Sequence, residues 1–436
     1  MKRRLVETWS QLTYRRRLAI VSVTGLLGRL IYVGFERPLR IWSDEHWYIT
    51  QAYRLLGDHP WSSIFDYSIP TASHGPLVSV FMSPFAALSP LNPNATAHET
   101  NIAMAELRYV VPFVGFLSLL GIASVVRQIA GDRAALTAAS LAVIYPGLWI
   151  RDGLVVSEPF AIAAFVWLLA ALLRWRRGPS WPLTLAVGLL IGAVALSRTE
   201  MLALAVIVTG VVWWHDRSTL PLWRPLAAVA IAALSCMPWV AYNSHRFEKP
   251  VYLSTNLGIT LAGANCHLAY YDGRYLGYDD MGCWAAASIA HPSPDESIRS
   301  SEMTHDAWQY AKAHVSRWPI VVAAREAWFF GLYRPQWVVF MSLGSGQQAW
   351  ATWAQAVGGY ILFPIFFWAM WRRRRPTSPV ERLARRLIFV TAAFSVALAA
   401  IFVGHWRYRL GLDLVALIGV SLWLAGSPPQ DERVIA

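Results

Sequence analysis

Asp44 and Glu45 are adjacent carboxylates that closely follow an apolar segment ending at Phe35. A carboxylate near a low-dielectric membrane boundary loses part of its hydration, which raises its basicity and suits a general base acting on a hydroxyl. The alternative is an ordinary solvated helix start, in which Ser43 caps the helix and the two acids occupy its first turn. Taken alone, the pair of carboxylates favours the ordinary helix start.

Three further polar positions stand at the ends of apolar segments. His74 lies in a Ser-His-Gly-Pro-Leu turn, which by itself resembles a helix start with proline near the first turn. Glu158 stands beside Arg151 and Asp152. Ionisable groups at such depth usually pair with one another, so a structural ion pair is the simpler interpretation. Arg198 lies between two apolar runs.

Arg407 and Arg409 alternate with aromatic residues between the last two apolar segments. The topology described below places them outside, where positive charge is disfavoured, so they call for an anionic partner. An arginine binds phosphate through its planar fork, and a lipid phosphate would lie at this height. Snorkelling of each arginine toward anionic headgroups is the alternative.

The elements that position these residues are those of a membrane protein. The chain has 436 residues, of which 56% are hydrophobic and 15% charged, with a mean hydropathy of +0.38. In a soluble domain about a quarter of the residues are charged, so the chain is expected to be embedded in membrane lipids. Its net charge of +12 does not indicate nucleic-acid binding, because the basic residues cluster beside apolar runs, as the positive-inside rule requires.

We therefore expect an all-α polytopic protein, with 1–436 forming one membrane domain. Ten apolar segments are candidate spans: 18–35, 107–126, 134–150, 154–173, 181–197, 201–214, 225–241, 349–371, 387–404 and 410–425. The basic cluster before the first span keeps the N-terminus in the cytoplasm and leaves two large loops outside, 36–105 and 242–348. The segment 76–91 is short and interrupted by prolines. Counting it as a span would invert the later loops, so we interpret it as a juxtamembrane or re-entrant helix.

Cys266 and Cys283 both lie in the second outside loop. An oxidising compartment would pair them in a disulfide, and two unrelated free cysteines are the alternative. Cys236 lies in a candidate span and is expected to be a small core residue. The three cysteines do not have the spacing of a zinc site.

In chain order, these motifs resemble the GT-C glycosyltransferases, particularly the protein O-mannosyltransferases and the bacterial aminoarabinose transferases. The resemblance covers most of the chain and depends on short motifs: Asp44-Glu45 with Tyr48, His74-Gly75-Pro76-Leu77, Arg108, Ser157-Glu158-Pro159, Leu196-Ser197-Arg198, Pro238-Trp239, Ser254 to Gly258, Gly263-Ala264-Asn265 and Arg407-Tyr408-Arg409. Gly75 departs from the pattern, because family members often have proline there. The chain is also shorter than members that carry an added C-terminal soluble domain.

The resemblance implies an inverting transfer of a hexose or pentose from a polyprenyl-monophosphate donor to a hydroxyl of a glycan, lipid or protein. The reaction would take place on the outer face of a bacterial inner membrane, without any nucleotide. Asp44 would be the general base, and Glu45 would hold the acceptor or a divalent metal. The donor phosphate would be bound by Arg407 and Arg409 together with His74 and Arg198, while Tyr48, Glu158 and Asn256 would contact substrate.

Two other classes of protein fit a polytopic chain with charged loops. A secondary transporter is disfavoured because the two halves of the sequence do not repeat each other. In addition, few ionisable residues lie inside the spans, and the outside loops are large. Another membrane enzyme acting on lipid-linked glycans remains an alternative. Turnover of a polyprenyl-phosphate sugar distinguishes a transferase from a transporter, which would instead exchange a small solute.

Overall fold

The computed structural model describes residues 11–36, 41, 43–57, 70–91, 96–344, 346–372, 375–376 and 378–426. The regular structure of these residues is helical throughout, without a strand. The α-helices are α2 (Tyr14–Glu36), α3 (Ser43–Arg54), α4 (Leu77–Ala87), α5 (Ala97–Glu106), α6 (Val111–Ile144), α7 (Ser157–Trp175), α8 (Trp181–Ser197), α9 (Met201–His215), α10 (Trp223–Ser244), α11 (Leu257–Ala264), α12 (His267–Tyr271), α13 (Met281–Ala290), α14 (Glu296–Ala313), α15 (Trp318–Phe329), α16 (Pro335–Gly344), α17 (Ala349–Arg372), α18 (Pro379–Ile401) and α19 (Leu410–Leu424). Short 3-10 helices include η1 (Leu107–Val110), η2 (Pro146–Leu148), η3 (Ile150–Gly153) and η5 (Trp406–Arg409).

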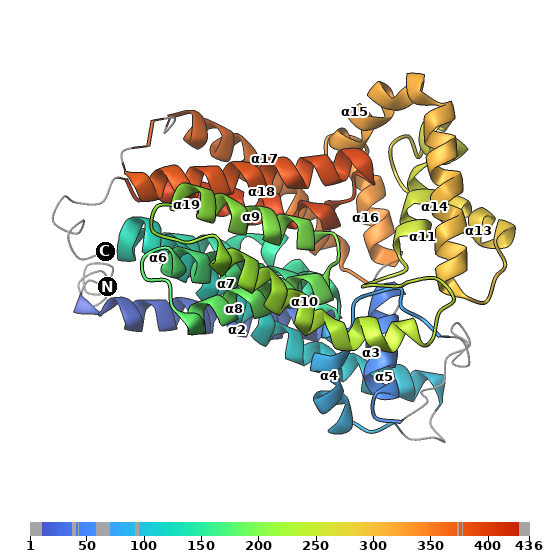
Figure 1. Ribbon diagram of the computed structural model, residues 1–436, viewed down its shortest axis with the longest axis horizontal. Coiled ribbons are helices and arrows are strands. Elements are labelled where there is room, and N and C mark those ends of the chain that lie inside the picture. The colour runs from blue at the N-terminus through green and yellow to red at the C-terminus, as the bar shows by residue number, and fades with distance from the viewer. Residues whose placement is uncertain are drawn as a thin grey trace.

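Six described segments are long and apolar enough to cross a membrane. Five of them are the helices α2, α7, α10, α17 and α18, and the sixth is the stretch His98–Ile144, which contains α6. The chain is therefore a multi-pass membrane protein. The long helices run side by side in Figure 1, with α8 packed between α7 and α10. The helix α19 packs against α6, α17 and α18, and nearly all of its residues are buried.

The helix α6 is bent back on itself at Gly131, whose φ of 79° is a conformation that glycine adopts without strain. A Cβ on Gly25 of α2 would lie 3.2 Å from Leu119 and 2.7 Å from Val143. Both of these residues are twelve positions from Gly131. The two halves of α6 therefore run antiparallel to each other, and both pack against α2. The two spans expected at 107–126 and 134–150 correspond to these two halves.

The short loops that carry basic residues gather at one end of the bundle. Arg127 pairs with Asp132 at 2.6 Å and lies over the ring of Tyr14, near the start of α2. At the end of α7, Arg176 pairs with Asp216, which follows α9, at 2.8 Å. These contacts bring together loops that the topology assigns to a single side of the membrane.

The helices of the two long loops gather at the opposite end, on the right in Figure 1. There α4 packs against α3 and η1, and with 11 residues it is much shorter than the roughly 20 residues of a span. Cys266 and Cys283 form a disulfide in the second loop. Glu296, at the start of α14, accepts hydrogen bonds from the amide of Ala72 and the hydroxyl of Thr255, both at 2.8 Å. This carboxylate therefore connects the two loops.

Four tryptophans spaced about ten residues apart in the second loop suggest helices that lie at the membrane interface. Trp308 and Trp318 are partly exposed, as this expectation requires. Trp328 differs, because it is completely buried against Tyr278 and donates a hydrogen bond to the carbonyl of Leu276. It is a core residue of this end of the molecule.

Candidate active site

A chain of ion pairs connects four of the residues singled out in the sequence. The Arg407 guanidinium donates one hydrogen bond to the carboxylate of Asp44 and another, of 2.5 Å, to Glu158. Glu158 also pairs with Arg198 at 3.1 Å, and Arg198 pairs with Glu200 at 2.6 Å. Residues that are up to 363 positions apart in sequence therefore form one polar network.

The network lies where the ends of four elements meet. Asp44 is in the first turn of α3, Glu158 in the first turn of α7, and Arg198 directly follows α8. Arg407 lies in η5, where the ring of His405 accepts a hydrogen bond from the amide of Arg407 at 3.0 Å and so caps the short helix. Glu158 is held by ion pairs, as the simpler interpretation expects, but its partners are Arg407 and Arg198. Asp152 binds Arg29 at 2.6 Å.

Asp44 is a weaker base in this structure than its position suggests. Burial raises its pKa, but the positive charge of Arg407 and the neighbouring His74 outweigh burial and lower the pKa to about 2. The Nε2 atom of His74 lies 3.6 Å from the Asp44 carboxylate, and burial lowers the pKa of this histidine. The expectation that partial desolvation increases the basicity of Asp44 is therefore wrong while Arg407 is in contact with it.

Glu45 faces away from this network. Its side chain is buried and receives two hydrogen bonds from Arg108, at 2.8 and 2.6 Å, and one from the amide of Val155 at 2.9 Å. Both carboxylate oxygens are thus engaged within the protein. The expectation that Glu45 holds the acceptor or a metal is replaced by a positioning role, since this ion pair fixes α3 against η1.

Arg409 is also directed elsewhere. Its guanidinium is buried among core residues, where it binds Asp413 at 3.0 Å and stacks against the rings of Phe363 and Trp406. The prediction that Arg407 and Arg409 share a phosphate therefore fails for Arg409. Of these two arginines, only Arg407 contacts Asp44 in the described part of the chain.

The turn that carries His74 is held tightly against α8. A Cβ at Gly75 would lie 2.2 Å from the carbonyl oxygen of Leu196, so no larger residue fits without a shift of the backbone. This close approach explains why glycine occupies a position where proline is common in the resembling family. The ring of His74 packs against Trp47 and Tyr48, with centroids 5.1 and 5.0 Å apart.

The second loop packs against the same turn. The hydroxyl of Ser254 donates a 2.5 Å hydrogen bond to the carbonyl of Ser73, next to His74. Asn256 follows two residues later and immediately precedes α11. The structure therefore brings the Asn256 segment beside the His74 turn, although no described contact joins the Asn256 side chain to the network.

Three residues beside the network were not assigned to it from the sequence. Arg151 is buried, and its charge acts on Glu158 and Arg407. The ring of Tyr278 lies 5.7 Å from that of His405. Next to Tyr278, burial raises the pKa of Asp279 to about 6. The carboxylate pair Asp279-Asp280 between the two bonded cysteines was the available sequence signal.

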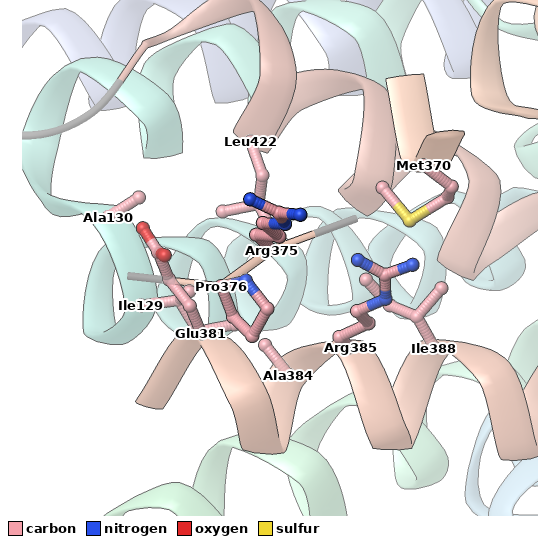
Figure 2. Close-up of a pocket in the computed structure, with 10 residues that line it drawn as sticks. All are labelled: Ile129, Ala130, Met370, Arg375, Pro376, Glu381, Ala384, Arg385, Ile388 and Leu422. Carbon is pink, nitrogen blue, oxygen red and sulfur yellow. The ribbon is translucent and has the colours of Figure 1, made fainter. Parts of the chain in front are cut away.

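Within the described ranges, no group of three or more His, Cys, Asp or Glu side chains is arranged to hold a metal ion. A cavity of about 90 Å³ lies at the opposite end of the bundle, beside Arg375 and Arg385 (Figure 2). The 23 residues of α18 separate its ends by roughly 34 Å, so this cavity is remote from Asp44.

Comparison with known proteins identifies the fold. No protein-family model and no curated protein sequence matches the chain. The apo oligosaccharyltransferase of Archaeoglobus fulgidus is similar over 95% of this chain and 50% of its own, with a TM-score of 0.55 and 14% identity. The same enzyme tethered to an acceptor peptide is similar over 92% of this chain and 49% of its own, with a TM-score of 0.50 and 17% identity.

A third solved structure, ArnT from Cupriavidus metallidurans bound to undecaprenyl phosphate, has a TM-score of 0.44 and 15% identity over 93% of this chain and 75% of its own. The chain shares the GT-C fold of the oligosaccharyltransferase. It spans about half the length of the oligosaccharyltransferase.

Proposed function

We propose that this protein is an integral membrane glycosyltransferase that transfers a sugar from a polyprenyl-monophosphate donor to a hydroxyl of a glycan, lipid or protein. The observation that carries the proposal is the bridge that Arg407 makes between Asp44 and Glu158. It puts a proton acceptor and a phosphate-binding guanidinium in direct contact. The fold, shared with an oligosaccharyltransferase solved with an acceptor peptide, supports the same class of reaction.

In the proposed reaction, the acceptor oxygen attacks the anomeric carbon from the face opposite the phosphate, which inverts the configuration. The bond between that carbon and the phosphate oxygen breaks, and its electron pair leaves with the polyprenyl phosphate. Asp44 takes the hydroxyl proton. Arg407 stabilises the negative charge that grows on the phosphate, which favours the transition state over the ground state.

Arg407 would couple the two halves of this reaction. While it binds Asp44, the carboxylate remains ionised but is a weak base. A donor phosphate competes with Asp44 for the same guanidinium, so Asp44 regains basicity when the donor is in place. Arg198 borders Glu158 and would maintain the positive potential around the phosphate. His74 borders Asp44 and would donate a hydrogen bond to the phosphate.

The proposed orientation puts this network on the extracytoplasmic face of a bacterial inner membrane, with the N-terminus in the cytoplasm and ten spans. Its support is the separation of charges along the bundle. The basic short loops gather at one end, as the positive-inside rule requires of a cytoplasmic face. The Asp44 network lies at the other end, where a lipid-linked sugar in the outer leaflet would be accessible.

The test uses purified protein in nanodiscs with a panel of labelled polyprenyl-phosphate hexoses and pentoses. Membranes from a deletion strain supply the acceptor, because they hold it unmodified. We expect label to move to the acceptor with the wild type and not with Asp44→Asn. Failure with every donor, combined with exchange of a small solute across proteoliposomes, would show a transporter instead.

A further inference from the structure

Arg151 stands apart from the other buried arginines. Five arginines in the described part of the chain are less than 9% exposed: Arg29, Arg108, Arg151, Arg325 and Arg409. Arg29, Arg108 and Arg409 bind carboxylates, and Arg325 donates to the carbonyls of three residues. Arg151 is 6% exposed, its Nε is buried, and it makes no hydrogen bond or ion pair with any described residue.

A buried guanidinium without a hydrogen-bond partner is costly, because its Nε donor loses water and gains no bond in return. Such a group at the edge of a polar network therefore indicates a binding site for an anionic ligand. The location of Arg151 supports this interpretation, since η3 leads directly into the start of α7, where Glu158 lies.

Two further donors, His405 and Tyr278, are near enough to Arg151 for its charge to act on both. The Nδ1 atom of His405 accepts the hydrogen bond from the Arg407 amide, so the proton of a neutral ring is on Nε2. Burial lowers the pKa of His405 well below its ordinary value, and the charge of Arg151 lowers it further, which keeps the ring neutral. Tyr278 packs against this ring, and its hydroxyl has no partner among the described residues.

We propose that Arg151, His405 and Tyr278 form a phosphate-binding subsite beside Arg407, and that this subsite receives the phosphate of the lipid donor. The inference rests on the proposed function and names the second arginine of the donor site, a role that was predicted for Arg409. The guanidinium supplies a planar fork for two phosphate oxygens, while the imidazole and the phenol each donate one hydrogen bond. Because His405 accepts the hydrogen bond of the Arg407 amide, a phosphate bound here would compete with Asp44 for Arg407.

The experiment measures thermal unfolding and binding affinity of the purified protein with three probes: undecaprenyl phosphate, undecaprenol and inorganic phosphate. Arg151→Met removes the charge at similar length. Arg325→Met is the matched control. Arg325 is similarly buried, but both of its terminal nitrogens donate hydrogen bonds to backbone carbonyls. Arg151→Lys keeps the charge and loses the fork.

We expect Arg151→Met without ligand to unfold at the wild-type temperature or above, since an unpaired charge is removed. Its affinity for undecaprenyl phosphate should fall at least about tenfold, the loss expected for a charged hydrogen bond, with a smaller fall for Arg151→Lys. Arg325→Met should unfold at a lower temperature, while its folded molecules retain the affinity.

Wild-type affinity for undecaprenyl phosphate in Arg151→Met would overturn the subsite and leave the proposed function standing. If the wild type binds undecaprenol as tightly as undecaprenyl phosphate, no phosphate is recognised and both proposals fail. A response to inorganic phosphate that depends on Arg151, without one to the lipid, would support the subsite and contradict the lipid donor.

Discussion

Asp44 and Glu45 are neighbours in sequence, and we predict that their amide substitutions separate chemistry from stability. Glu45 and Arg108 are 2% and 0% exposed, and they share two hydrogen bonds of 2.8 and 2.6 Å. Glu45→Gln keeps one oxygen, which can serve either Arg108 or the Val155 amide, and removes the charge that compensates a buried guanidinium. Breaking one partner of a buried ion pair costs about 3–5 kcal/mol, so the free energy of unfolding should fall by roughly this amount.

Asp44→Asn should show the opposite pattern. The Asp44 side chain is 21% exposed, and Arg407 keeps its bond to Glu158 when the charge on Asp44 is lost. The pKa shift from 3.8 to about 2 corresponds to roughly 2 kcal/mol, which limits the loss of stability. Turnover should nevertheless fall about a hundredfold or more, because the proton acceptor is missing.

The assay combines equilibrium unfolding in mixed micelles with turnover normalised to the folded fraction. Glu45→Gln should retain near-wild-type turnover per folded molecule. A double variant, Glu45→Leu with Arg108→Met, should recover much of the lost stability, because apolar replacement of both partners of a buried pair is often neutral. If Glu45→Gln were as stable as the wild type but inactive, Glu45 would belong to the chemistry and our assignment would be refuted.

Three further outcomes are expected. The pKa of Asp44 in the free protein is about 2, so kcat/KM should not fall as the pH is lowered to about 4. In the complex the phosphate shares Arg407, so the fall of kcat on acidification should begin at a higher pH. If kcat and kcat/KM fell at the same acidic pH, Arg407 would not exchange partners. Gly75→Ala forces a Cβ to within 2.2 Å of the Leu196 carbonyl, and the displaced His74 turn should lower turnover by roughly a hundredfold, while Gly28→Ala, at an uncrowded position, should leave turnover unchanged. An impermeant maleimide should label Lys312→Cys on intact cells and Arg217→Cys only after permeabilisation, since both positions are exposed at opposite ends of the bundle; the reverse result would invert the topology.

The helical segments could be predicted from the sequence because a bilayer admits few alternatives to an apolar helix. Where a helix extends beyond its apolar stretch, hydropathy fails. The span expected to begin at residue 387 belongs to α18, which begins at Pro379. The first turns of α18 carry Arg382, Arg385 and Arg386 on one face and bury Leu383 and Ala384 on the other. This amphipathic start contributes to helix formation and packing, but a hydropathy average does not register it.

The site residues could be predicted by type and region, but not by the direction in which each side chain points. Consecutive residues of an α-helix differ in direction by about 100°, so Asp44 faces Arg407 while Glu45 faces Arg108. In a 3-10 helix, positions two apart differ by roughly 240°, which sends Arg407 to Asp44 and Arg409 to Asp413.

Arg151 and Asp152 in η3 divide in the same way, because Asp152 binds Arg29 whereas Arg151 is left for a ligand. In each of these pairs, one charge neutralises a buried partner and fixes the backbone, and the other is directed toward the polar network. The rotational phase of each short helix decides which residue does which. For Glu45 and Asp152, that phase is set by packing against segments more than sixty positions away, and a local motif contains no information about it.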